Sequence, residues 1–306
     1  MRAYIRISMG ASIVAIFLFA FALKAQNKKS SPPPVFRVDV ETVSVKVSVT
    51  DPLIRYVTGL EKEHFRVYED NIEQTITHFS QEAAPISAGL IFDVSASMKD
   101  NNNIRKAKNA IARFLESGNP QDELFLITFN NKINLALDFT DQSSALQSEA
   151  ALQKPGGTTA LWDAVYRGLN KIKEGKRDKK ALIVVTDGED NSSRYSANEI
   201  SDFAKEMDVQ IYAIGQEGML GTGRYSIQSI VNLTGGRAFF PNNFSELDYY
   251  IDLIHAELRS QYVLWYHPTN KTHDGKWRRI KVKLDAPQGL PKLIVRAKEG
   301  YNAPKL

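Results

Sequence analysis

The stretch Ala88-Gly89-Leu90-Ile91-Phe92-Asp93-Val94, residues 88–94, is a nearly unbroken apolar run that contains a single carboxylate. A strand that is covered on both faces needs no alternating polar residues, so this run predicts a buried strand of a parallel sheet. Runs of the same kind follow at residues 124–129, 181–185 and 209–214. The sequence therefore predicts a sheet of mostly parallel strands that begins near residue 86.

Amphipathic segments separate these apolar runs. Ile104, Ala107, Ile111 and Phe114 recur at helical spacing after the first run. The clearest helical stripe consists of Leu161, Ala164, Val165, Gly168, Leu169 and Ile172. Further helices are expected between the last two runs and at about residues 245–260. Strands that alternate with helices predict a doubly wound, Rossmann-like α/β domain over residues 86–260.

Shorter β segments flank this domain. Val43, Val45, Val47 and Val49 alternate with polar residues, which predicts a half-buried strand with one wet face, and residues 36–82 are expected to form a small β module. Residues 261–306 hold three more expected strands, in one of which Arg279, Lys281 and Lys283 alternate with apolar residues. Because each β part is small, we expect the two to pair into one sandwich-like module.

The N-terminus has the pattern of a secretory signal. Arg2 and Arg6 precede an apolar run at residues 7–23, and a small residue, Ala25, follows. We expect residues 1–25 to be a cleaved signal peptide and residues 26–35, which contain three consecutive prolines, to be an extended linker. The protein is then periplasmic, on the cell surface or secreted. An uncleaved membrane anchor is the alternative reading.

Composition excludes several classes of function. The sequence holds no cysteine, which excludes disulfides and thiolate metal sites. The formal net charge is +4, and it falls to +1 once the three basic residues of the expected signal peptide are removed. This near-neutral balance gives no electrostatic reason to expect nucleic acid as a partner.

Three polar segments follow predicted strands or precede a predicted helix. They are Asp93-Val94-Ser95-Ala96-Ser97, Gly156-Gly157-Thr158-Thr159 and Thr186-Asp187-Gly188. Loops at the carboxyl ends of parallel strands converge, and hydroxyl and carboxylate oxygens are the ligands that a hard cation such as Mg²⁺ prefers. Each segment alone has a simpler reading as a helix cap or a turn. Their coincidence indicates a metal site.

Together the three segments resemble the metal-ion-dependent adhesion site (MIDAS) of von Willebrand factor type A domains. The resemblance implies that serine and threonine hydroxyls contact the cation and that the two aspartates hold it directly or through water. The residues implied as ligands are Asp93, Ser95, Ser97, Thr158 and Asp187, with Thr159 as the alternative threonine. The expected cation is Mg²⁺, with Mn²⁺ or Ca²⁺ as alternatives. An Asp or Glu from a protein partner is expected to complete the coordination of the partly unshielded ion.

The flanking segments resemble more narrowly the exported A-domain proteins of Acidobacteria and similar bacteria. The segments concerned are Gly59-Leu60, Phe65-Arg66-Val67-Tyr68-Glu69-Asp70, Asp187-Gly188-Glu189-Asp190-Asn191-Ser192-Ser193, Gln261-Tyr262-Val263-Leu264, Gly275-Lys276-Trp277-Arg278 and Arg296-Ala297-Lys298-Glu299-Gly300-Tyr301. Asn71 stands where that group usually has glycine, and asparagine still tolerates a left-handed turn.

The resemblance predicts a non-enzymatic adhesion or assembly module. A metal-dependent phosphohydrolase with Asp93 as nucleophile is an alternative, although Ser95 occupies the position where such enzymes need a second acid. A structural envelope protein with a vestigial site is the third reading. Stability that does not respond to Mg²⁺ would favour this third reading.

Overall fold

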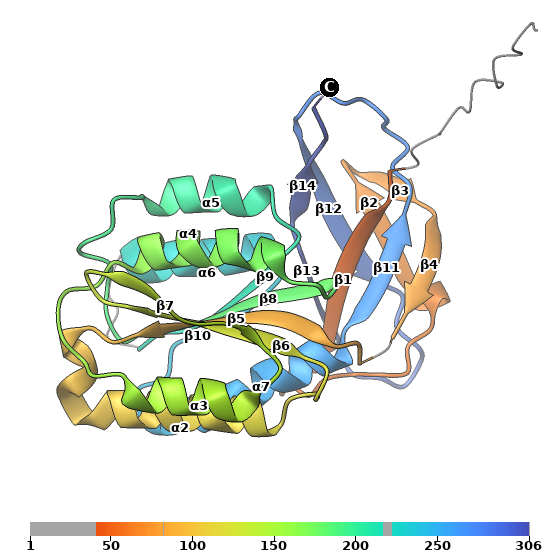
Figure 1. Cartoon of the computed structure of the whole chain (residues 1–306). Helices are drawn as coiled ribbons and strands as arrows, with labels where there is room; N and C mark the ends of the chain where they lie inside the picture. The colour runs from red at the N-terminus through yellow and green to blue at the C-terminus, as the bar shows by residue number, and fades with distance from the viewer. Residues whose placement is uncertain (1–40, 82, 217–221, 306) are drawn as a thin grey trace, which may run out of the picture. The chain divides into compact units, whose positions relative to one another are not determined.

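The computed structural model describes residues 41–81, 83–216 and 222–305 (Figure 1). Residues Glu41–Leu306 form one compact unit. The expected signal peptide, the linker and the first residues of the expected β module lie outside the described residues. Within the described part of the chain, no helix has both the length and the apolar character that crossing a membrane requires.

A six-stranded sheet forms the centre of the α/β part, in the order β10-β9-β8-β5-β6-β7. Five strands are parallel: β5 (Ile86–Asp93), β6 (Glu123–Phe129), β8 (Lys179–Val185), β9 (Gln210–Ile214) and β10 (Ala238–Phe239). The sixth, β7 (Ile133–Thr140), runs antiparallel to β6 at the edge of the sheet. The predicted doubly wound, mostly parallel sheet is confirmed, with one antiparallel strand that the sequence did not predict.

Helices cover both faces of this sheet (Figure 1). One face packs against α2 (Asn103–Glu116), α3 (Ser143–Leu152) and α7 (Leu247–Ser260), and the other against α4 (Leu161–Lys171), α5 (Ala197–Lys205) and α6 (Thr222–Thr234). The described residues also form 3₁₀ helices, which are η1 (Lys62–His64), η2 (Ala96–Asn102), η3 (Ile172–Glu174) and η4 (Phe244–Glu246). Residues spaced as expected on α2, such as Ala107, Ile111 and Phe114, are buried against the sheet.

Two four-stranded sheets combine strands from before and after the α/β part. The first has the order β13-β1-β11-β4 and the second β14-β12-β2-β3. Their strands are β1 (Val43–Thr50), β2 (Phe65–Glu69), β3 (Ile72–Gln74), β4 (Ile76–Ser80), β11 (Tyr262–Tyr266), β12 (Trp277–Leu284), β13 (Ile294–Ala297) and β14 (Gly300–Asn302). β1 pairs antiparallel with β11, and β2 with β12, so the two ends of the chain pair in both sheets. One apolar cluster, including Val47, Phe65 and Tyr262, lies between the sheets.

The predicted wet face of β1 is wrong. Lys46, Ser48 and Thr50 are buried together with the valines, because this face of β1 lies against the α/β part. Ser48 Oγ donates to Glu257 Oε1 of α7 at 2.9 Å, and Lys46 Nζ lies 2.8 Å from Asp208 Oδ2, which precedes β9. The polar residues of β1 therefore join the antiparallel sheets to the α/β part.

Glu257 is fully buried at this junction, with an exposed fraction of 0%. Besides Ser48, it accepts a hydrogen bond from the Tyr56 hydroxyl at 2.9 Å, and Arg237 Nε lies 3.5 Å from Glu257 Oε2. Burial raises the pKa of the Tyr56 hydroxyl, and the neighbouring Glu257 charge raises it further. Tyr56 therefore remains a hydrogen-bond donor at neutral pH.

Removal of the Glu257 carboxylate is expected to destabilise the protein. In Glu257→Ala the Ser48 hydroxyl loses its acceptor, the Tyr56 hydroxyl keeps only the Leu253 carbonyl, and the buried Arg237 loses its counter-charge. Loss of one partner of a buried ion pair costs about 3–5 kcal/mol, so we expect a decrease of that size in the free energy of unfolding, measured by urea denaturation. Glu116→Ala, at an exposed position of α2, is the control and should change this free energy by less than about 0.5 kcal/mol. Equal changes in the two variants would contradict this account.

Candidate metal site

The polar segments predicted from the sequence meet at the carboxyl edge of the central sheet. β5 and β8 are parallel neighbours, so Asp93 at the end of β5 and the residues that follow Val185 lie at the same edge. The Gly156–Gly157 segment before α4 is fastened beside them, because Gly156 N donates to Val94 O at 2.8 Å and Ala96 N donates to Gly157 O at 2.9 Å. Three segments that are distant in sequence thus form one loop cluster.

Asp93 is fully buried and is held by neutral donors. Its Oδ1 accepts from Ser95 N at 2.7 Å, and its Oδ2 accepts from Thr186 Oγ1 at 2.5 Å. Burial raises the pKa of the Asp93 carboxyl to about 6, although the hydrogen bonds from Ser95 and Thr186 oppose the shift. The negative charge of Asp187 nearby raises this pKa further. A cation at this position would stabilise the ionised form.

Asp187 is the second carboxylate of the cluster. Its Oδ1 accepts from Ser97 Oγ at 2.7 Å, and its Oδ2 accepts from Asn103 Nδ2 at 2.9 Å. Ser97 Oγ also lies 3.0 Å from Ser95 Oγ. Four of the five predicted ligands, Asp93, Ser95, Ser97 and Asp187, are therefore joined in one network of direct contacts.

Thr159, rather than Thr158, lies beside this network, next to Gly188. Thr158 is exposed, and its hydroxyl bonds to Ser192 Oγ at 2.6 Å. Thr159 is buried, and a Cβ placed on Gly188 would lie 3.3 Å from Thr159 Oγ1 and 3.5 Å from Ser97 Oγ. The Thr159 and Ser97 hydroxyls therefore both lie close to Gly188. Of the two adjacent threonines, Thr159, the alternative ligand, therefore lies nearer to Ser97, whereas the hydroxyl of Thr158, the first choice, contacts Ser192.

Two residues that support the carboxylates were not predicted. Thr186 holds Asp93, and Asn103, the first residue of α2, holds Asp187. Thr186 directly precedes a predicted ligand, and that position was the one available signal for its role. Asn103 gives no such signal, because it is the last of three consecutive asparagines and nothing in the sequence distinguishes it from its neighbours.

The donor set fits a hard divalent cation. Within residues 41–81, 83–216 and 222–305, neither Asp93 nor Asp187 forms an ion pair with a basic side chain, and no three His, Cys, Asp or Glu residues cluster as metal ligands. The available ligands are two carboxylates and three hydroxyls, which suit Mg²⁺, Mn²⁺ or Ca²⁺ rather than a metal that prefers sulfur or imidazole. A buried carboxylate without a basic partner also needs a compensating charge.

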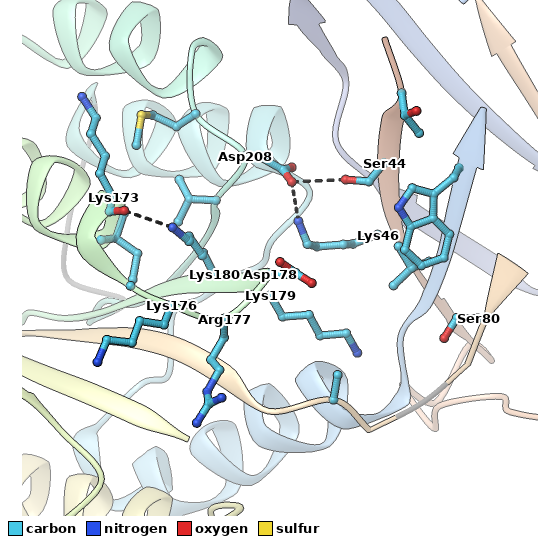
Figure 2. A pocket seen from close by; sticks show the side chains of 18 of the residues that line it. Ser44, Lys46, Ser80, Lys173, Lys176, Arg177, Asp178, Lys179, Lys180 and Asp208 are labelled. Atoms are coloured by element: carbon cyan, nitrogen blue, oxygen red, sulfur yellow. Dashed lines mark hydrogen bonds and ion pairs between the residues drawn. The ribbon is translucent and has the colours of Figure 1, made fainter. Parts of the chain in front are cut away.

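A cleft of about 770 Å³ lies at the opposite end of β8, where Lys179 begins the strand. Figure 2 shows that Asp208 accepts hydrogen bonds from Lys46 and Ser44 in this cleft. The side chains of Lys176, Arg177 and Lys179 extend in different directions. Lys298 Nζ also lies 3.1 Å from Asp208 Oδ1. The basic side chains do not converge on one point, so the cleft is not arranged as an anion site. We interpret it as part of the junction between β1 and the α/β part.

Comparison with known proteins agrees with this fold. The family model for the von Willebrand factor type A domain matches residues 89–252, which is more than half of the chain. No curated protein matches the chain.

Among solved structures, proximal thread matrix protein 1 from the mussel byssus, with a zinc-occupied MIDAS motif, is 20% identical, with 62% of this chain and 49% of that chain covered and a TM-score of 0.51. A second structure of that protein is 18% identical, with 72% and 50% covered and a TM-score of 0.50. The chain thus spans about half the length of the mussel protein, and at this identity the likeness concerns the fold alone.

The assignment of the threonine can be tested with two matched substitutions. Thr159→Val removes the hydroxyl beside Ser97 while keeping the shape of the side chain, so we expect the affinity for Mg²⁺ to fall about tenfold or more. Thr158→Val removes a hydroxyl that contacts Ser192 instead, and we expect it to leave the affinity within about twofold. Isothermal titration calorimetry with MgCl₂ measures both. The reverse order of effects would restore Thr158 as the ligand.

Proposed function

Because the chain belongs to the von Willebrand factor type A family, we propose that it is an exported protein-binding module whose partner binds through a divalent cation. The observation that supports this proposal is the gathering of two carboxylates and three hydroxyls in one loop cluster, without a basic partner for the carboxylates among the described residues. Such a set of oxygen ligands has the chemistry of a cation site rather than of a salt-bridge network.

The proposed ligands are Asp93, Ser95, Ser97, Thr159 and Asp187. The three hydroxyls contact the cation, and the two carboxylates hold it directly or through water. Mg²⁺ is the first choice because the set contains few carboxylates, and Mn²⁺ and Ca²⁺ are the alternatives. The zinc in the MIDAS motif of the mussel protein supports a divalent ion in a site of this type.

The proposed partner supplies an Asp or Glu side chain. A bound divalent ion supplies a positive charge at the surface of the loop cluster. The residues around it weaken the neutralising effect of the two carboxylates, because Ser97 and Asn103 donate to Asp187 and Thr186 donates to Asp93. The ion then retains attraction for one more carboxylate. This arrangement favours adhesion or assembly with a protein that presents an acidic residue.

The neighbours of Asp93 support a binding function over catalysis. A phosphohydrolase that uses Asp93 as nucleophile requires a general acid close by to protonate the leaving group. Ser95 occupies that position, and its hydroxyl contacts Ser97. We therefore infer a non-enzymatic role.

Export is part of the same proposal. Residues 1–25 act as a signal peptide and residues 26–35 as a linker, and the protein works in the periplasm, on the cell surface or after secretion. The mature chain then consists of a β module at residues 36–82, the A domain at residues 86–260 and a C-terminal β segment at residues 261–306. Absence of cysteine suits an oxidising compartment.

Capture of a partner should depend on both the cation and Asp93. With the purified protein as bait in an envelope or secretome fraction of the source organism, we expect proteins retained in Mg²⁺ to be released by EDTA. Asp93→Asn keeps the shape of the side chain and removes its charge, so it should lose these proteins. Asp178→Asn, at an exposed position at the other end of β8, is the control and should keep them. Proteins retained equally by wild type and Asp93→Asn would contradict a metal-bridged mechanism, provided that both baits show the same thermal unfolding.

A further inference from the structure

Asn103 lies beside the proposed metal site without being one of its ligands. It is the first residue of α2, and only 3% of it is exposed. Its Nδ2 donates to Asp187 Oδ2 at 2.9 Å and lies 3.4 Å from Gln216 Oε1. The preceding residue, Asn102, has a left-handed backbone with φ of 57°, which begins the helix at this position. Asn103 therefore contacts two acceptors from two different loops.

The amide of Asn103 is the chemical group that this position requires. Both neighbouring atoms, Asp187 Oδ2 and Gln216 Oε1, accept hydrogen bonds, and an NH₂ group has two hydrogens to donate. An aspartate of the same shape would have no hydrogen to donate when ionised, and it would place a negative charge against Asp187. The amide thus satisfies both loops without changing the charge of the site.

The contact also fixes the orientation of Asp187. Ser97 Oγ donates a hydrogen bond to Asp187 Oδ1 at 2.7 Å, and Asn103 Nδ2 donates one to Asp187 Oδ2 at 2.9 Å. Each oxygen of the carboxylate therefore has its own donor. Oδ1 faces the serine hydroxyls, whereas Oδ2 is turned toward the start of α2. Asp187 can then offer a single oxygen to the cluster, and this limits the negative charge that reaches the cation.

We propose that Asn103 is a positioning residue that sets the charge of the metal site, because it orients Asp187 and keeps a third carboxylate out of the ligand environment. This inference rests on the proposed function. A site with two carboxylates leaves the cation attractive to an acidic partner, whereas a third carboxylate would bind the cation more tightly and compete with that partner. The side chain at position 103 therefore distinguishes a site that binds a partner from one that only stores a cation.

Three single substitutions test the proposal through cation affinity. Asn103→Asp adds a carboxylate next to Asp187, so we expect the affinity for Ca²⁺ to rise about tenfold. The affinity for Mg²⁺ should rise less, because Ca²⁺ accepts more carboxylate ligands. Asn103→Ala removes the donor that orients Asp187, so Oδ1 is no longer held toward the serine hydroxyls. We expect this loss of orientation to outweigh the negative charge that Oδ2 regains, and the affinity for both ions to fall about tenfold. Asn102→Asp adds the same charge one residue earlier, at an exposed position, and should match wild type within about twofold.

The measurement is isothermal titration calorimetry with CaCl₂ and MgCl₂ on the full mature chain, with thermal unfolding in EDTA as the control for folding. Opposite changes in Asn103→Asp and Asn103→Ala support the proposal, because a residue with a purely structural role would lower the affinity in both. A fall in both variants, or no change in either, overturns it. If wild type itself binds neither ion, the proposed function fails; if wild type binds and the variants do not diverge, this inference alone fails.

Discussion

The site is built around a buried carboxylate, Asp93, that has no basic neighbour within the described part of the chain. It lies at the end of β5, in the middle of a parallel sheet, where water is excluded and the loops on either side diverge. Burial raises the pKa of this carboxyl to about 6, and the hydrogen bonds from Ser95 and Thr186 oppose the shift only in part. The loops after β5 and β8 each contribute a neutral donor, and the remaining cost of the charge can be offset by a cation.

At the other end of the sheet, the carboxylates of Asp208 and Glu257 do have basic partners. There Lys46 and Lys298 share the carboxylate of Asp208, and Glu257 is enclosed by Ser48, Tyr56 and Arg237. Charges at this end are compensated within the protein, so they fasten β1 to the α/β part and leave little attraction for a ligand. Charges at the carboxyl end lack such compensation, and this difference separates a structural junction from a candidate binding site.

Hydrophobic periodicity predicted the parts of the fold that are buried on one or both sides, and failed where burial is partial. The apolar runs became β5, β6, β8 and β9, and the stripe that begins at Leu161 became α4. β7, α3 and α6 were missed. β7 is only half-buried along its length, and α3 buries only Leu146 and Ala150. α6 was missed although its Ile227, Ile230 and Val231 are buried, so partial burial does not explain that case. The alternation in β1 was read as a wet face, because a sequence does not show that a second layer covers its polar side. Arg279, Lys281 and Lys283 on β12 have the same pattern and are exposed as expected.

The chemistry of the candidate site could be predicted from residue types, but its detailed geometry could not, because the geometry depends on backbone contacts between the loops. Val94 and Gly157 accept backbone hydrogen bonds that bring the first two loops together, and Thr159 O accepts from Asn191 N at 2.9 Å, which attaches the third. Side chains from other loops add to these bonds, since Asn191 Oδ1 accepts from Thr159 N and Ser192 Oγ donates to Thr158 Oγ1, and such contacts between distant segments cannot be read from the sequence. The backbone bonds also mean that the backbone holds the loops, so the hydroxyls are not needed to hold the cluster together. A hydroxyl of this cluster can then be lost with a large effect on cation binding and a small one on stability, which is the behaviour of a site that is separable from its fold.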